Sequence, residues 1–305
     1  MHLAEGMLPL YQAIGWSALS VPVLIWSIRG EQRARQENPA SSVIMTGVTS
    51  LLFAATLLPL PVPIIGATSH ICLTPLFALM LGIRRLVWPT FFVLLLQAVF
   101  FAHGGITTLG INTLTLGFFG PLCTIGLWNT LEKSRLNSTI GLGIACAVGS
   151  LSVYFIDALV LAIALSDLTP PATTFTSVSL GFAPVQIPLS ILEAFVSVKI
   201  VQVLATRRAD LLPTRLSMLR SPSVPVEHMI LLFCVGLLSG CDYEGIDGTV
   251  FGKMAEHAGR PPTDSFLDYS QGEVGLAMSI LILFGLGFVA GRSWEKLISG
   301  ERDAL

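Results

Sequence analysis

The sequence contains little charge: only 12% of its 305 residues are Asp, Glu, Lys or Arg, about half of the roughly 25% usual in soluble domains. Hydrophobic residues make up 53% of the chain, and the mean hydropathy is +0.76. A soluble enzyme of this length would need more charge to cover its surface, so that class is excluded as a first interpretation. A net charge of −2 argues against a nucleic-acid-binding protein, which would carry a basic patch. The composition predicts a polytopic membrane protein.

The sequence also lacks two common motifs. None of its five cysteines stands in a Cys-x-x-Cys pair or in the Cys/His spacing of a structural zinc site. Four of the five lie in apolar runs, where a buried cysteine behaves as a small hydrophobic residue. There is no Gly-x-x-x-x-Gly-Lys-Ser/Thr phosphate-binding loop, so we do not expect this chain to hydrolyse ATP.

Apolar runs long enough to cross a bilayer recur along the chain, since a spanning helix needs about 20 mostly apolar residues. They are residues 8–28, 43–61, 86–102, 109–128, 139–165, 180–204, 226–240 and 273–291. Residues 64–83 add an outer loop that leads into one further helix. We therefore expect an all-α transmembrane bundle with about nine membrane-spanning segments.

The basic residues predict the orientation of this bundle. Fourteen of the 17 Lys and Arg residues fall in alternate connections between the predicted helices. The positive-inside rule then places the N-terminus outside and the C-terminus in the cytoplasm. The first residues have no basic stretch and no small-residue cleavage site follows them, so we expect the first helix to be retained rather than removed as a signal peptide.

Charge and proline content divide the chain into three parts. Residues 1–205 form the helix-rich part, and residues 206–226, which are basic and contain three prolines, are predicted to be a cytoplasmic linker. Residues 227–305 form two apolar segments around an outer loop, residues 241–273, that has seven acidic and two basic residues. Such a loop concentrates cations by electrostatic steering. A loop kept acidic only to remain outside is the alternative.

Three histidines on the predicted outer side are candidate metal ligands. The Met1 amine, the amide nitrogen of His2 and its ring Nδ1 can form fused chelate rings, and three coplanar nitrogens suit nickel, cobalt or copper. A fourth ligand must come from elsewhere, and His70 lies in a polar loop at the mouth of an apolar segment. His103 is a third imidazole on that side. Each histidine has an alternative as an interfacial or solvated side chain.

Two acidic residues, Asp157 and Glu193, lie inside predicted membrane segments, where a charge costs at least about 2.5 kcal/mol. They are interpreted as polar contacts between helices, with a proton relay or an acid–base pair as the alternative. No intramembrane His-Glu-x-x-His or Gly-Asp motif accompanies them. Asn112 has the same interpretation and is close enough to the outer loop to support a metal ligand.

Four ordered motifs, spread over about residues 1–205, resemble the signatures of the CbiM/NikM family. They are residues 1–9 (Met-His-Leu-Ala-Glu-Gly-Met-Leu-Pro) with 13–17, residues 66–70 (Gly-Ala-Thr-Ser-His), residues 97–112 with their central His-Gly-Gly-Ile-Thr-Thr, and residues 186–189 followed by Glu193. Members of this family are substrate-binding S components of energy-coupling-factor (ECF) transporters for cobalt and nickel. The resemblance implies an ion held by the Met1 amine, the His2 amide and imidazole, and the His70 imidazole. Ser69, His103 and Asn112 are expected to be accessory residues around it.

The C-terminal part, residues 227–305, resembles the small CbiN/NikN subunit, which consists of two helices around an outer loop. The resemblance implies that this subunit is fused to the S component here. Residues 246–248 (Ile-Asp-Gly) stand where that subunit has a Pro-Asp-Gly motif.

The resemblance implies a transporter subunit rather than an enzyme, placed in the inner membrane of a prokaryote. Its substrate is expected to be Co²⁺ for cobalamin biosynthesis, with Ni²⁺ as the alternative, and no cofactor is expected. The implied partners are a transmembrane coupling protein and two cytoplasmic ABC-type ATPases, in contact with the lipid bilayer and not with nucleic acid. A membrane metal sensor and an intramembrane acid–base enzyme are the alternatives from other functional classes.

Overall fold

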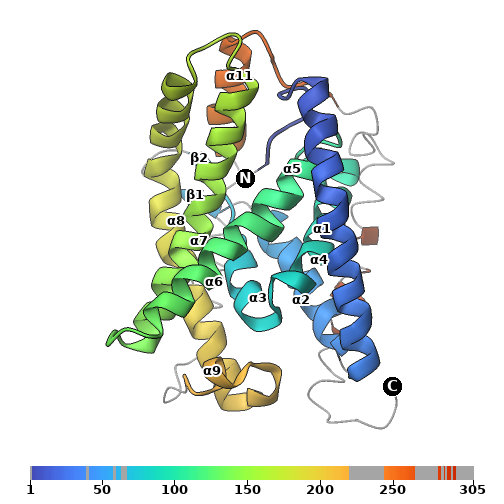
Figure 1. Ribbon diagram of the computed structural model, residues 1–305, viewed down its shortest axis with the longest axis vertical. Coiled ribbons are helices and arrows are strands. Elements are labelled where there is room, and N and C mark those ends of the chain that lie inside the picture. The colour runs from blue at the N-terminus through green and yellow to red at the C-terminus, as the bar shows by residue number, and fades with distance from the viewer. Residues whose placement is uncertain are drawn as a thin grey trace.

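The computed structural model describes residues 2–38, 41–57, 60–62, 67–219 and 244–264, and a few single residues between 281 and 292. The helices are α1 (Leu10–Glu37), α2 (Ser41–Leu57), α3 (Thr74–Leu81), α4 (Ile83–Phe100), α5 (Leu109–Leu114), α6 (Gly120–Leu131), α7 (Ser138–Ala164), α8 (Pro171–Arg207), α9 (Thr214–Ser217) and α11 (Lys253–His257). Shorter turns of helix are the π-helices η1 (Thr115–Phe119) and η3 (Gly248–Gly252) and the 3₁₀ helix η2 (Ala209–Leu211). The strands are β1 (Leu60–Val62), β2 (Ala67–Ser69) and β3 (Glu244–Gly245). The long helices lie side by side along the long axis of the molecule (Figure 1).

Five helices in the described part of the chain are long and apolar enough to cross a membrane. They are α1, α4, the continuous helix Leu109–Leu131, α7 and α8. The prediction of an all-α transmembrane bundle is confirmed, since the strands are only two or three residues long. The count of nine crossings and the orientation stay predictions, and the last two predicted crossings fall mostly outside the described residues.

The helix expected within residues 64–83 is much shorter than a spanning helix. It is α3, whose eight residues reach about 12 Å at 1.5 Å per residue, less than half of the ~30 Å hydrocarbon core. The helix ends at Gly82, where a φ of 78° turns the chain directly into α4. The chain therefore enters α3 inside the bundle, and residues 70–73, which connect β2 to α3, are buried.

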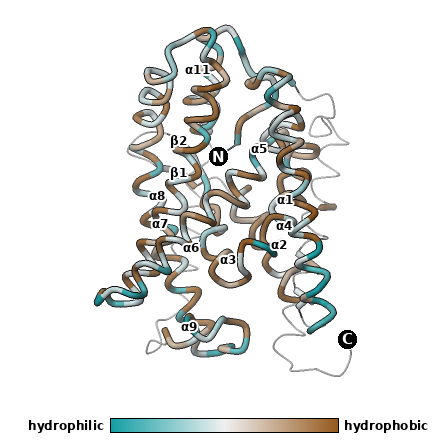
Figure 2. Tube along the Cα trace, in the orientation of Figure 1, coloured by the Kyte–Doolittle hydropathy of each residue, from teal (hydrophilic) through white to brown (hydrophobic). Residues whose placement is uncertain are grey.

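The outward surfaces of the long helices are apolar, as a lipid-facing surface requires. Figure 2 shows hydrophobic residues along most of α1, with a hydrophilic stretch at its C-terminal end. Leu10, Ile14 and Leu19 of that helix are 50 to 70% exposed. Small residues allow close packing inside the bundle: a Cβ at Gly149 of α7 would overlap the side chain of Thr124 on α6.

Part of the predicted linker packs against the bundle. The helix α8 continues to Arg207, two residues past the predicted boundary at residue 205, and η2 and α9 follow it. Leu212 and Leu216 are buried there, and Arg215 forms a 2.7 Å ion pair with Glu132. Residues 220–226 lie outside the described residues.

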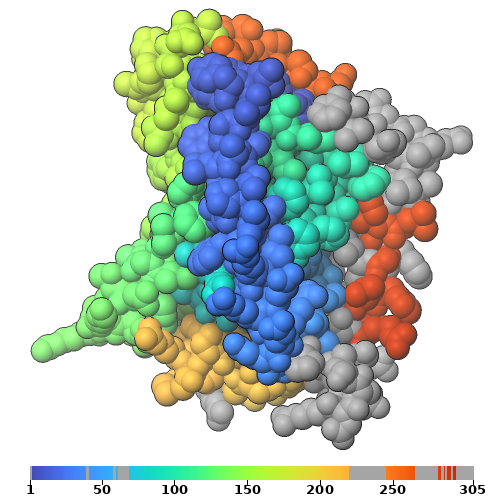
Figure 3. All heavy atoms as spheres, turned by 45° about the vertical axis from the view of Figure 1, so that its right-hand side comes forward, coloured from blue at the N-terminus to red at the C-terminus, as the bar shows by residue number. Residues whose placement is uncertain are grey.

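Residues 244–264, called the cap segment below, belong to the predicted outer loop and lie against the helix-rich part. Strand β3 pairs in parallel with β2, which also pairs antiparallel with β1. Farther along, Phe251 is fully buried and its ring centroid lies 4.5 Å from that of Phe182 on α8. The cap segment thus covers the end of the bundle where α1 begins (Figure 3).

Candidate metal centre

Residues 2–9, the N-terminal segment, run into the bundle instead of lying on its surface. Leu3 is fully buried, and its backbone is held by two polar side chains from the start of the helix Leu109–Leu131. Asn112 Oδ1 accepts a hydrogen bond from Leu3 N at 3.0 Å, and Asn112 Nδ2 donates to Leu3 O at 3.0 Å. Thr108 Oγ1 donates to the same carbonyl at 2.6 Å. Because both backbone groups of residue 3 are held, the position of the preceding histidine is fixed.

Glu5 connects the N-terminal segment to the loop between α4 and α5. Its carboxylate accepts hydrogen bonds from Ile106 N at 2.7 Å and Thr107 N at 3.2 Å. A Cβ at Gly105 would lie 2.6 Å from the Glu5 nitrogen, and Gly104 has a φ of 89°. Glycine is therefore required twice, once for close approach and once for a left-handed backbone. This explains the Gly-Gly pair that follows His103.

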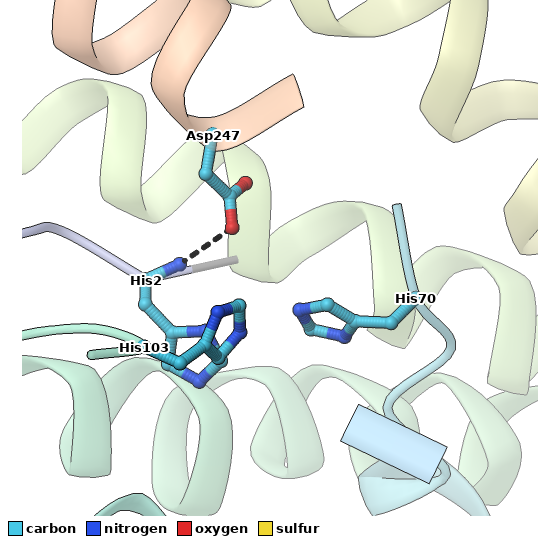
Figure 4. Close-up of side chains that lie close together, drawn as sticks. All are labelled: His2, His70, His103 and Asp247. Atoms are coloured by element: carbon cyan, nitrogen blue, oxygen red, sulfur yellow. Dashed lines mark hydrogen bonds between the residues drawn. The ribbon is translucent and has the colours of Figure 1, made fainter. Parts of the chain in front are cut away.

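Three imidazole rings and one carboxylate meet at this end of the bundle (Figure 4). The ring centroids of His2 and His103 are 4.4 Å apart, and His70 lies 5.4 Å from each of them. Asp247 of the cap segment accepts a hydrogen bond from His2 N at 3.3 Å. One potential ligand atom from each of these four residues lies within 4.8 Å of the other three. The arrangement has the size of a metal site.

The environment of the rings suits metal binding. His2 and His70 are 3% and 5% exposed, and neither ring nitrogen of His2 has a hydrogen-bond partner. Burial, with repulsion between neighbouring rings, lowers the pKa of both histidines well below 6.5, and burial lowers the pKa of His103 to about 3. All three rings are therefore neutral at pH 7 and keep a lone pair for a metal. Buried polar atoms without partners are rare, which points to a ligand that these nitrogens bind.

His70 is positioned by helices α7 and α8. The preceding Ser69 accepts a hydrogen bond from Gln186 Nε2 at 2.7 Å, and its hydroxyl lies 3.3 Å from the hydroxyl of Tyr154. On the other side of His70, Glu193 accepts bonds from Cys72 N, Leu73 N and Ser150 Oγ at 3.2, 2.8 and 2.8 Å. The loop that carries His70 is thus attached to both helices.

The role of Glu193 follows from these three bonds. Its carboxylate receives two backbone N–H groups directly before α3, where the positive end of the helix dipole favours a negative charge. Asp157 is fully buried on α7, seven residues after Ser150 and so about 10 Å farther along the helix. The two carboxylates are therefore not neighbours through α7. Polar contacts are described for Glu193, whereas both carboxylate oxygens of Asp157 are buried without a hydrogen-bond partner among the described residues.

The predicted site residues are placed as follows. His2, His70 and His103 come together, Asn112 holds the N-terminal segment, and Ser69 bonds to Tyr154 and Gln186, while Met1 lies outside the described residues. Sequence reasoning missed the supporting role of Glu5, which resembles any terminal acidic residue. It placed Asp247 only in a motif of an acidic loop, with no signal that this carboxylate reaches the histidines.

Known proteins resemble this chain over most of its length. The family model CbiM, described as a cobalt uptake substrate-specific transmembrane region, matches residues 2–211. A cobalt transport protein CbiM of Geobacter sulfurreducens is 28% identical over 316 residues, covering 99% of this chain and 91% of that protein. The namesake from Sorangium cellulosum is 34% identical over 212 residues, covering 70% of this chain and 94% of that protein.

Two solved structures share the fold. A crystal structure of a transition metal transporter superposes with a TM-score of 0.56 at 22% identity and covers 68% of this chain and 93% of that one. A truncated transition metal transporter gives a TM-score of 0.55 at 24% identity, with 68% and 99% covered. At these identities the likeness describes the arrangement of the helices.

Proposed function

The chain belongs to the CbiM family of cobalt-uptake transmembrane proteins, and from this premise we propose that it is the subunit that captures Co²⁺ for an ATP-driven importer. As a multi-pass membrane protein of a transport family, it is a component of metal uptake rather than an enzyme. The proposal adds the substrate, the site that binds it and the source of energy.

The observation that carries the proposal is the group His2, His70, His103 and Asp247. Neutral imidazoles with one carboxylate oxygen form a donor set of the kind that divalent transition metals prefer. The site lies on the outer side in the predicted orientation, where an importer must collect its substrate. We further propose the Met1 amine and the His2 amide as ligands. The amide would release its proton to water when it binds the metal, and its hydrogen bond to Asp247 would be lost.

Cobalt is preferred to nickel as the substrate because the relatives are named cobalt transport proteins. The Irving–Williams order gives Ni²⁺ the higher affinity for a given set of donors, so selectivity for Co²⁺ has to come from the number and geometry of ligands. A planar set of nitrogens alone would favour Ni²⁺, which is the alternative substrate.

The energy would come from partner proteins. The sequence has no phosphate-binding loop of its own, so the proposal includes an ECF-type complex with a transmembrane coupling protein and two cytoplasmic ATPases. In this complex the chain would reside in the inner membrane of a prokaryote and supply cobalt for cobalamin biosynthesis. The C-terminal part would be a fused CbiN/NikN-like hairpin.

Metal uptake by cells that express the chain, with and without the partner proteins, tests this function. Uptake of Co²⁺ should require the partners and should be lost in His2→Ala and His70→Ala. His257→Ala is the matched control, because this histidine is exposed on α11 and outside the metal centre. One extra residue before Met1 should also reduce uptake, although every side chain is kept. Unchanged uptake in both histidine variants would refute the proposed site.

A further inference from the structure

The cap segment is attached to two of the three parts of the chain that carry metal-site histidines, the strand before His70 and the N-terminal segment. At one end, β3 pairs with β2 through Ala67–Glu244 and Thr68–Gly245, so His70 follows one strand and Asp247 follows the other. At the other end, Thr263 N donates a 3.0 Å hydrogen bond to Glu5 O of the N-terminal segment. Parallel pairing brings the residues that follow two strands to the same edge. The position of Asp247 beside the rings is therefore set by the backbone.

Asp247 differs from the other acidic residues of the cap segment whose side chains are described. Its Oδ2 lies 3.3 Å from His2 N and belongs to the group of four possible ligand atoms. Glu256 and Asp264 are exposed and take no part in that group. Figure 4 shows the Asp247 carboxylate directed toward the space above the three rings.

The charge of the site gives this carboxylate a specific task. The neutral imidazoles bring no negative charge, and the deprotonated His2 amide proposed above brings only one. A divalent ion transferred from water to this buried site therefore still needs one negative charge to compensate for the hydration it loses. Asp247 supplies one negative charge within 4.8 Å of every ring nitrogen in the group. A planar set of nitrogen ligands favours Ni²⁺ over Co²⁺. An oxygen ligand from Asp247 would add to that set and so reduce the preference for Ni²⁺.

We propose that Asp247 is a direct ligand of the captured ion, so that the metal site is complete only when the cap segment is seated. This inference rests on the proposed function, because it assumes that the histidines bind the metal. When the ion enters, Asp247 exchanges its hydrogen bond with His2 N for a bond to the metal. The bound ion then joins the cap segment, the N-terminal segment and the loop of His70, and metal occupancy stabilises the seated cap.

The test is a Co²⁺ titration of the purified full chain, followed by calorimetry and by the visible absorption of the bound Co²⁺. Asp247→Asn is expected to lower the affinity at least about ten-fold and to change the cobalt spectrum, since a ligand has been altered. Asn still offers Oδ1 as an acceptor for His2 N, so a residue that only positions His2 would leave both readouts nearly unchanged. Glu256→Gln removes the same charge from an exposed position and should behave as wild type.

Two outcomes overturn the inference. An affinity and spectrum equal to wild type in Asp247→Asn would exclude a direct ligand, and so would a lower affinity with an unchanged spectrum, which is the result of electrostatic attraction alone. Thermal unfolding without metal verifies that the variant is folded. His70→Ala separates the two proposals: if it abolishes binding while Asp247→Asn does not, only the role of Asp247 is wrong. If neither variant affects binding, the proposed function itself is wrong.

Discussion

Asn112 is the residue through which the bundle holds the N-terminal segment, and Asn112→Ala would release that hold without altering a metal ligand. Its side chain bonds to both Leu3 N and Leu3 O, each at 3.0 Å. After the substitution Thr108 still donates to Leu3 O, whereas Leu3 N loses the acceptor described for it. The backbone next to His2 would then be held on one side only.

The size of the effect follows from these contacts. Losing the bond to Leu3 O costs about 1 kcal/mol, and leaving the buried Leu3 N–H without an acceptor costs about 1–3 kcal/mol. The seated N-terminal segment is thus destabilised by about 2–4 kcal/mol. Because 1.4 kcal/mol corresponds to a factor of ten, the largest expected loss of affinity for Co²⁺ lies between about 30-fold and several hundred-fold. The full loss is reached when the seated state becomes the minor population.

Calorimetric titration of the purified chain with Co²⁺ measures this loss. Asn129→Ala is the matched control, because Asn129 is an exposed asparagine on α6 that lies outside the metal centre. It should bind Co²⁺ as the wild type does. A wild-type affinity in a folded Asn112→Ala variant would refute the idea that the N-terminal segment must be held in the bundle for metal capture.

Three further predictions concern the surroundings of the site. Gly105→Ala places a Cβ 2.6 Å from Glu5 N and should weaken Co²⁺ binding. Gly126→Ala, with open space around its Cβ, should bind Co²⁺ as the wild type does, and equal affinities of the two variants would contradict this prediction. Glu193→Ala leaves two buried N–H groups without their acceptor and should lower the melting temperature by the equivalent of at least about 2 kcal/mol; an unchanged melting temperature would disprove the anchoring role. Burial lowers the pKa of His103 to about 3, below the value of about 6.5 in the unfolded chain. Between these two values the unfolded chain binds a proton that the metal-free folded protein does not, so the free energy of unfolding is highest above about pH 6.5 and falls as the pH falls toward 3. Between pH 7 and pH 5 the melting temperature should therefore fall less steeply in His103→Asn than in the wild type. The same pH dependence in both proteins would contradict a lowered pKa of His103.

Much of the fold was predictable because membrane insertion is decided by local composition. Long apolar runs with few charges have to form helices in lipid, so the helical bundle could be predicted from the sequence. The short helix α3 was harder to foresee, because Thr74–Leu81 are mostly apolar yet lie inside the bundle, where other helices replace lipid as their surroundings. Hydropathy does not distinguish these two environments.

The candidate site was predictable to the extent that it depends on local motifs. The His at position 2, the polar loop before His70 and the His-Gly-Gly sequence at 103–105 were visible as candidates, and the structure brings these three rings together. Glu5 and Glu193 stood within the recognised motifs, but the sequence did not show their partners, which include backbone N–H groups more than 100 residues away. A carboxylate that serves a distant backbone looks the same in sequence as one that faces water.

The sequence alone therefore determined that the chain is a membrane bundle, that it resembles one transport family and that three histidines are candidate ligands. These properties depend on composition and on short contiguous motifs. Tertiary structure decided that residues 2, 70, 103 and 247 meet, and that Asp247 rather than Glu256 or Asp264 reaches the rings. The reason is physical: such contacts depend on how helices and strands pack across the whole chain, and equivalent carboxylates in one loop differ only in where the backbone carries them.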